Sequence, residues 1–222
     1  CDWIDHSGPS SAWTWCIDPI DGTKGFLRGD QYAIAIGILR EGVPFAGVLA
    51  CPNLPVDLDD PESPRGVIFA ALRGEGAKRC PLDGEGWESV RVSNRAAADA
   101  RVLGSVESAH GDPALVVRMM EDAGMEGGFV RFDSQVKYGV LAQGDAEIYV
   151  RPRSRPDWRE NPWDHAGGVV VAEEAGGRVT DLDGKALDFS SGGKMVHNRG
   201  VLATNGIVHE AAVAGLQAAE AI

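Results

Sequence analysis

The segment from Trp15 to Phe26 constrains the chain most, because a short apolar run leads directly into two aspartates in a tight turn. Pro19 stiffens this turn and disfavours helical backbone at Asp18. Asp21 follows three residues after Asp18, so two carboxylates lie close together where a strand is expected to end. Carboxylates at this spacing repel each other, and a divalent cation that prefers oxygen ligands, such as Mg²⁺, relieves the repulsion. The sequence therefore predicts a strand that ends in a metal site.

The other residues of this turn offer further ligands. The carbonyl of Ile20 can face the same metal ion as the carboxylates. Gly22, Thr23 and Lys24 can present backbone N–H groups, a hydroxyl and an ammonium to an anion, and a helix that starts here strengthens such a site. The alternative is an ordinary Asp-Pro and Asp-Gly turn that caps a helix, since these residues favour turns for local reasons.

The hydrophobic pattern changes near residue 100. Before that point the chain predicts a large, mostly antiparallel sheet and a Pro- and Asp-rich loop over 52–64. Its strands are expected at 13–17, 32–39, 45–51, 66–72 and 88–92. After that point, short strands alternate with helices, which is typical of an α/β layer. These helices are expected over 113–123, 135–142, 163–175 and from 207 onwards. We expect an α+β domain over residues 1–100 and an α/β domain over 101–222.

Charge and cysteine content exclude several classes of protein. Lys and Arg number 21 and Asp and Glu number 33, so the net charge is 21 − 33 = −12, the opposite of what a nonspecific nucleic-acid or acidic-membrane binder carries. No apolar run reaches the length of a membrane span. The four cysteines are scattered without a CxxC pair, which excludes a zinc pattern and a dense disulfide framework and favours a reducing compartment.

A second acidic signature, Pro162-Trp163-Asp164-His165-Ala-Gly-Gly168, precedes an apolar helix. Asp164 lies where this helix is expected to start, and capping the helix is the alternative to metal binding. Glu173 and Glu174 follow about three turns later along the helix. We interpret these two glutamates as a solvated or packing face rather than as ligands.

Together, the two acidic segments resemble the metal motifs of the lithium-sensitive, Mg²⁺-dependent inositol monophosphatase superfamily. The extension Lys24-Gly-Phe26-Leu-Arg28-Gly-Asp30-Gln-Tyr32-Ala and the segment Ser134-Gln-Val-Lys137-Tyr138 are similar to one branch, the 3′(2′),5′-bisphosphate nucleotidases. The resemblance covers essentially the whole chain. It implies a layered αβαβα sandwich and a phosphatase that removes the 3′-phosphate from adenosine 3′,5′-bisphosphate (PAP) to give AMP, with phosphoadenosine phosphosulfate (PAPS) as a further substrate to consider.

The resemblance also implies roles for individual residues. Two or three Mg²⁺ ions would be held by Asp18, the Ile20 carbonyl, Asp21 and Asp164. Asp21 and Thr23 would take part in catalysis, the latter by orienting the attacking water together with an upstream acid. The substrate would be bound by Gly22, Thr23, Lys24, His110, Ser134, Lys137 and Arg151. Without the resemblance, Lys137 reads as an exposed lysine, His110 as a structural histidine and Asp133 as a turn residue.

The resemblance is incomplete at the start of the chain. Family members carry an N-terminal helical region and a Glu-Glu metal motif upstream of the point that corresponds to Cys1. We therefore expect a truncated member whose first helical layer is missing, with an exposed apolar sheet face and little activity for the chain alone. A targeting signal would also lie upstream, so the cytoplasm is expected only by default.

Other functions remain open at this point. One alternative is a relative of inositol monophosphatase or inositol polyphosphate 1-phosphatase, which the Lys24-Gly-Phe26 extension disfavours. A second alternative is a catalytically dead protein that binds a metal ion or a nucleotide. We expect a monomer that binds a small nucleotide bisphosphate and neither nucleic acid nor membrane.

Overall fold

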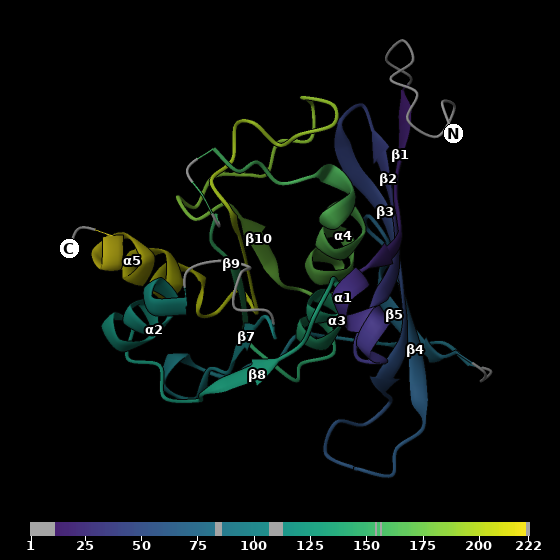
Figure 1. Ribbon diagram of the computed structural model, residues 1–222, viewed down its shortest axis with the longest axis horizontal. Helices are drawn as coiled ribbons and strands as arrows, with labels where there is room; N and C mark the ends of the chain where they lie inside the picture. Colours follow the sequence, from purple (N-terminus) through teal and green to yellow (C-terminus); the bar gives the residue numbers. More distant parts are fainter. Residues whose placement is uncertain (1–11, 83–85, 107–112, 154, 156, 221–222) are drawn as a thin grey trace.

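The molecule is built of four alternating layers (Figure 1). This structure is a computed structural model, and it describes residues 12–82, 86–106, 113–153, 155 and 157–220. One sheet forms the first layer, a group of helices the second, another sheet the third and a pair of helices the fourth. The layered α/β sandwich predicted from the sequence is thus confirmed.

The first sheet, sheet A, is antiparallel throughout and its six strands follow the order of the chain. The strands are β1 Trp13–Asp21, β2 Ala33–Arg40, β3 Val43–Pro55, β4 Arg65–Leu72, β5 Gly76–Pro81 and β6 Glu88–Ser89. β3 extends into the expected loop, and β5 was not predicted because its polar sequence lacks an apolar run. β1 extends through the Asp-Pro turn and is irregular between Asp18 and Asp21, where it leaves its regular register with β2.

The second sheet, sheet B, is mixed and has the strand order β10-β11-β9-β7-β8. Its strands are β7 Val102–Gly104, β8 Phe129–Arg131, β9 Ile148–Arg151, β10 Arg178–Thr180 and β11 Val201–Thr204. β7 pairs in parallel with β8 and β9, whereas β11 pairs antiparallel with β9 and β10. Sheet A thus comes from residues before 100 and sheet B from residues after it, and the division into two domains stays a prediction.

Five α-helices of the described chain complete the layers. They are α1 Thr23–Arg28, α2 Pro113–Asp122, α3 Val136–Ala142, α4 Ala166–Glu174 and α5 His209–Glu220. The helices α1, α3 and α4 lie between the two sheets, and α2 and α5 cover the outer face of sheet B (Figure 1). Short 3₁₀ turns occur at η1 Ala97–Asp99 and η2 Pro162–Asp164. Within the described ranges, no helix is both long and apolar enough to cross a bilayer.

Helix α4 is apolar on all sides because it is buried between the two sheets. The helix expected over 163–175 is interrupted, since its first residues form η2 and His165 has the non-helical angles φ −137 and ψ −36. The glycines of sheet A let the start of α4 approach closely. A Cβ on Gly47 would lie 2.2 Å from the carbonyl oxygen of Gly167, and one on Gly37 would lie 2.5 Å from Ala166 Cβ. Sheet A therefore sets the position of the helix start that follows Asp164.

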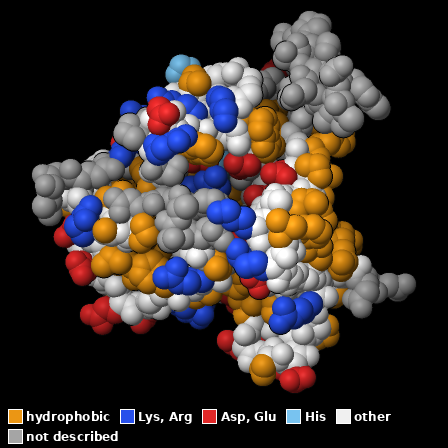
Figure 2. Space-filling model, viewed as in Figure 1, with side chains coloured by type: hydrophobic (Ala, Val, Ile, Leu, Met, Phe, Trp, Pro, Cys, Tyr) orange, Lys and Arg blue, Asp and Glu red, His pale blue; other side chains and the backbone are white. Residues whose placement is uncertain are grey.

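The face of sheet A turned away from α4 exposes large apolar side chains. Trp15 is 61% exposed, Ile17 49% and Leu72 41%. Cross-strand partners continue the patch, since Trp15 pairs with Ile38 and Ile17 with Ile36. Hydrophobic side chains gather along the edge of the molecule where sheet A lies (Figure 2). The expected exposed apolar face is confirmed.

Candidate functional site

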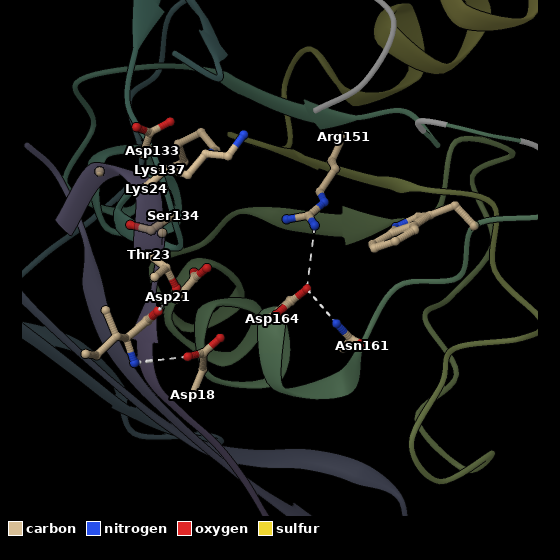
Figure 3. A pocket seen from close by; sticks show the side chains of 14 residues that line it. Asp18, Asp21, Thr23, Lys24, Asp133, Ser134, Lys137, Arg151, Asn161 and Asp164 are labelled. Atoms are coloured by element: carbon tan, nitrogen blue, oxygen red, sulfur yellow. Dashed lines mark hydrogen bonds and ion pairs between the residues drawn. The ribbon is translucent and has the colours of Figure 1, made fainter. Parts of the chain in front are cut away.

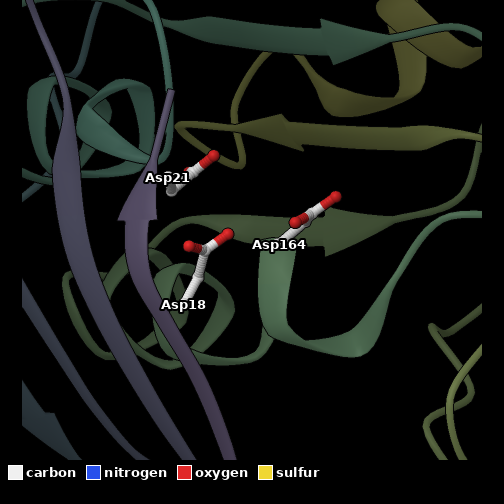
Figure 4. A group of neighbouring side chains, drawn as sticks. All are labelled: Asp18, Asp21 and Asp164. Atoms are coloured by element: carbon white, nitrogen blue, oxygen red, sulfur yellow. The ribbon is translucent and has the colours of Figure 1, made fainter. Parts of the chain in front are cut away.

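Three carboxylates, two from the first half of the sequence and one from the second half, lie close together in the folded protein (Figure 4). Asp18 and Asp21 lie at the end of β1, and Asp164 lies at the end of η2. One carboxylate oxygen of each residue lies within 4.8 Å of the others. The two acidic segments, about 140 residues apart in sequence, thus form one cluster.

Burial and mutual repulsion disfavour the ionised form of these carboxylates. Burial and the neighbouring charge of Asp21 raise the pKa of Asp18 to about 6. Burial and the charge of Asp164 also raise the pKa of Asp21, although Lys137 and Arg151 oppose the shift. A divalent cation would favour the ionised carboxylates by neutralising this repulsion, and three carboxylates at this spacing suit a hard cation such as Mg²⁺.

The alternative in which these aspartates only cap helices does not fit the structure. The residue that caps α1 is Gly22, with φ 83, and it makes no side-chain cap hydrogen bond. The residue that caps α4 is His165, again without a side-chain cap bond. Asp164 Oδ2 instead accepts a hydrogen bond from Asn161 Nδ2 at 3.1 Å and lies 3.5 Å from an Nη atom of Arg151. The carboxylates therefore do not serve as the caps of α1 and α4.

Other parts of the first turn also face this space. The N–H of Ile20 donates to Asp18 Oδ1 at 3.0 Å, and the hydroxyl of Thr23 donates to the Ile20 carbonyl at 3.2 Å. A carbonyl oxygen has two lone pairs, so the bond from Thr23 leaves one for a further partner. Ile20 can thus add a neutral oxygen to the three carboxylates.

A pocket of about 320 Å³ opens beside the carboxylates (Figure 3). Its lining consists of Asp18, Ile20, Asp21, Gly22, Thr23, Lys24, Gly25, Asp133, Ser134, Lys137, Arg151, Trp158, Asn161 and Asp164. Basic side chains therefore come from three separate segments, with Lys24 on α1, Lys137 on α3 and Arg151 on β9. Acidic and basic groups that line one pocket suit a metal ion next to an anionic ligand.

Lys137 and Ser134 line the pocket, and the substrate contacts that the resemblance implies for them stay predictions. Lys137 is buried rather than exposed, and its Nζ donates to the carbonyl of Phe132 at 3.1 Å. Burial lowers the pKa of Lys137 to about 8, against the opposing charge of Asp21. Ser134 adopts φ 62, and its hydroxyl accepts the N–H of Val136 at 3.3 Å. Ser134 therefore helps to begin α3 while it also faces the pocket.

Arg151 is held by a buried polar network that the sequence did not reveal. Its Nε lies 3.0 Å from Glu160 Oε2, and the same carboxylate oxygen lies 3.2 Å from His165 Nε2. His165 Nδ1 contacts the hydroxyl of Tyr138 at 2.9 Å. Burial alone would raise the pKa of Glu160, but His165 and Arg151 lower it to about 2. The network fixes the guanidinium between Glu160 and Asp164.

Several further expectations can be compared with the structure. Asp133 is more than a turn residue, since its Oδ2 lies 2.6 Å from Nη2 of Arg28. Glu174 accepts the N–H groups of Gly74 and Gly76, and Glu173 pairs with Arg73, so both glutamates contact the turn between β4 and β5. His110 lies outside the described residues, and its expected contact with substrate stays a prediction.

Two kinds of similarity place the chain among known proteins. It is 41% identical over 202 residues to the 3′(2′),5′-bisphosphate nucleotidase of Schizosaccharomyces pombe, covering 89% of this chain and 57% of the relative. It is 44% identical over 211 residues to the rice protein of the same name, covering 92% of this chain and 58% of the relative. The chain thus spans less than two thirds of the length of these relatives.

Solved structures share the fold. The IMPase of Thermotoga maritima superposes with a TM-score of 0.72 at 24% identity, covering 96% of this chain and 72% of that one. The inositol monophosphatase of Anabaena gives a TM-score of 0.71 at 24% identity, covering 96% of this chain and 74% of that one. The sequence model described as the inositol monophosphatase family matches residues 3–221. On this evidence, the chain belongs to the inositol monophosphatase family.

Proposed function

We propose that the chain forms the metal and substrate site of a Mg²⁺-dependent phosphatase that removes the 3′-phosphate from PAP, giving AMP and phosphate. The observation that carries this proposal is the meeting of Asp18, Asp21 and Asp164 beside a pocket lined by basic side chains. The names of the S. pombe and rice relatives support the choice of substrate. PAPS, which carries the same 3′-phosphate, is a second substrate to test.

The residues of the cluster would hold the metal. Asp18, Asp21 and Asp164, with the Ile20 carbonyl, offer oxygens for two or three Mg²⁺ ions. When bound, the metal supplies Lewis-acid polarisation of the phosphate and a lowered pKa for the attacking water. The three carboxylates carry charge of the same sign, so the fold places a negatively charged site where the cation would bind.

The remaining residues would orient the substrate and the water. Lys24, Lys137 and Arg151 would bind phosphate oxygens, with Arg151 held in place by Glu160. Thr23 already donates its only hydroxyl proton to Ile20, so its oxygen can accept a hydrogen bond from a water molecule. The proposed phosphate contacts also include Ser134 and the N–H groups of Gly22 and Thr23. Asp21 and Thr23 are the residues that we propose to take part in catalysis.

The test measures ion binding and turnover separately. Mn²⁺ binding is followed by electron paramagnetic resonance, and phosphate release is followed with PAP, PAPS and inositol 1-phosphate. We expect Mn²⁺ binding in the wild type and a loss of at least about tenfold in affinity in Asp164→Asn, because one of three charged ligands becomes neutral. The control is Glu173→Gln, at the other end of α4, which should bind Mn²⁺ as the wild type does.

The outcomes separate the competing functions. Faster release from PAP than from inositol 1-phosphate supports the nucleotidase, and the reverse preference supports an inositol phosphatase. Binding of Mn²⁺ and PAP without any turnover fits a non-catalytic binding protein, and it equally fits the low activity expected for this chain without the upstream acids. A wild-type chain that binds no Mn²⁺, or an Asp164→Asn variant that binds it equally well, would contradict the proposed metal site.

A further inference from the structure

The carboxylates of the cluster come from segments that are far apart in the sequence. Asp21 lies on β1 and Asp164 on η2, and nothing in the covalent chain between these distant segments fixes their spacing. Their mutual repulsion favours separation whenever no cation is bound. A geometry suited to a metal must therefore be held by other groups that reach both segments.

Gln135 contacts the first of these two segments through its backbone. Its N–H donates to Asp21 Oδ2 at 2.6 Å, across 114 positions of sequence. The residue is 2% exposed, so water competes little for this bond. The bond uses one oxygen of Asp21 and so orients the carboxylate towards the cluster.

The side chain of the same residue contacts the second segment at two points. Its Nε2 donates to the carbonyl of Trp163 at 2.9 Å, and its Oε1 accepts the N–H of Gly168 at 3.3 Å. These two partners lie on either side of Asp164, one residue before it and four residues after it. One buried amide thus connects the end of η2 with the first turn of α4.

The segment that carries Gln135 is itself fixed on its other side. Asp133 is held by Arg28 at 2.6 Å and lies 3.4 Å from the hydroxyl of Ser105. Ser134 takes the left-handed angle φ 62, which is uncommon for a residue with a side chain. This turn points the N–H of Gln135 towards Asp21, whereas the pocket lining includes Ser134 and Lys137 on either side of Gln135 but not Gln135 itself.

We propose that Gln135 is the positioning residue of the metal centre, which joins the Asp21 and Asp164 segments so that their carboxylates are spaced for a cation before one binds. The inference rests on the proposed function, since it assumes that the cluster binds a metal. Gln135 touches neither the pocket nor the expected ligand atoms other than Asp21 Oδ2. Its side chain acts through Trp163 and Gly168.

If Gln135 had only a structural role, removing another buried amide of the same kind should weaken Mn²⁺ binding as much. The chain offers a matched control for this comparison. Asn205 is 3% exposed, its Nδ2 donates to the carbonyl of Arg95 at 2.9 Å, and its Oδ1 accepts the N–H of Val208 at 3.2 Å. Like Gln135, it joins a loop to the region where a helix begins. Asn205 does not line the pocket.

The experiment compares Gln135→Met with Asn205→Leu, two substitutions that remove an amide and keep most of its volume. Mn²⁺ affinity is measured by electron paramagnetic resonance, and amide hydrogen exchange is measured by NMR in the metal-free protein. Residues that support metal ligands from behind typically change affinity by about 10- to 100-fold. We expect a loss of this size in Gln135→Met, together with faster exchange of the Gly168 and Asp164 N–H groups.

For Asn205→Leu we expect Mn²⁺ affinity within about twofold of the wild type at a comparable loss of thermal stability. If Gln135→Met does not fold, Gln135→Asn decides, because its shorter amide cannot reach both Trp163 and Gly168. The inference would be overturned if a folded Gln135 variant bound Mn²⁺ as the wild type does, or if Asn205→Leu lost as much affinity. Either result would leave the proposed metal site standing. Failure of the wild type to bind Mn²⁺ would instead refute the proposed metal site, and the inference with it.

Discussion

Nη2 of Arg28 lies 2.6 Å from Oδ2 of Asp133, so the end of α1 is joined directly to the turn before α3. The two segments are 105 residues apart in sequence, and each contributes a lysine to the pocket. Asp133 is 5% exposed and Arg28 is 37% exposed. The pair therefore spans the boundary between solvent and interior, where an ion pair is screened less than at the surface.

Removing this ion pair should reduce stability measurably. We expect Asp133→Asn to lower the free energy of unfolding by about 2 kcal/mol, because a charge-assisted hydrogen bond between partly buried groups is lost. A double-mutant cycle with Arg28→Met, followed by urea denaturation, isolates the coupling of the two side chains. We expect a coupling energy of about 1 kcal/mol or more.

The matched control for this cycle is the exposed pair of Arg178 and Glu210, whose side chains are 47% and 79% exposed. Its coupling energy should stay below about 0.5 kcal/mol. Equal coupling in the two pairs would show that Arg28 and Asp133 contribute no more than an ordinary surface contact.

Close packing of α4 on sheet A leads to a second prediction. A Cβ on Gly47 would lie 2.2 Å from the carbonyl oxygen of Gly167, which is backbone and cannot rotate away. We expect Gly47→Ala to destabilise the protein by about 2–3 kcal/mol and to weaken Mn²⁺ binding, because α4 must shift together with Asp164. The control is Gly104→Ala, whose Cβ would meet Phe129 Cδ1 at 3.7 Å. An equal effect of the two substitutions on thermal stability would contradict this account.

The sequence predicted those parts of the fold and site that depend on local residues. The Asp-Pro-Ile-Asp turn is local, so the pair of Asp18 and Asp21 could be assigned to a strand end from their spacing and from Pro19. The apolar runs located most strands of sheet A for the same reason. β5 was missed because Lys78 and Arg79 are stabilised there by pairing with β4 rather than by their own propensity.

Contacts between distant segments could not be predicted from the sequence. Asp164 was assigned to the cluster only through the family resemblance, since nothing local distinguishes it from a helix cap. Gln135 looked like one residue of a helix, although its amide joins two segments. Glu160 and His165 carried no signal, because their bonds with Arg151 and Tyr138 exist only after folding. Each of these contacts depends on packing that no short window of sequence contains.

The raised pKa of Asp18 leads to a third prediction. Burial and the charge of Asp21 raise this pKa to about 6 in the folded protein, from 3.8. The folded state therefore binds more protons at Asp18 than the unfolded state does between these values, so the contribution of Asp18 to stability falls as the pH rises from about 4 to about 6. We expect Asp18→Asn to raise the stability of the metal-free protein at pH 7 by about 1 kcal/mol, after allowance for solvent screening, and to change it little at pH 4.

Thermal unfolding in the presence of a chelator measures this effect, and about 1 kcal/mol corresponds to a rise of about 2–4 °C in Tm. Asp188→Asn is the control, because hydrogen bonds from Ser190 lower the pKa of Asp188 and its removal should bring no gain at pH 7. Added Mg²⁺ should stabilise the wild type more than Asp18→Asn. A metal-free Asp18→Asn variant less stable than the wild type at pH 7 would show that Asp18 is not under electrostatic strain.

Acid should destabilise the protein through His209. This side chain is buried, with Nε2 3.0 Å from Thr180 Oγ1 and Nδ1 3.0 Å from Thr204 Oγ1, and burial lowers its pKa to about 4. Because the folded pKa lies below the usual value of 6.5, its contribution to stability is complete above pH 6.5 and is lost as the pH falls towards 4. The loss should amount to about 2–3 kcal/mol in urea denaturation. In His209→Gln the decline in stability over this pH range should be smaller than in the wild type. Replacement of the exposed His197 by Gln is the control and should leave the decline unchanged. A decline in His209→Gln as steep as that of the wild type would assign the acid sensitivity to other groups.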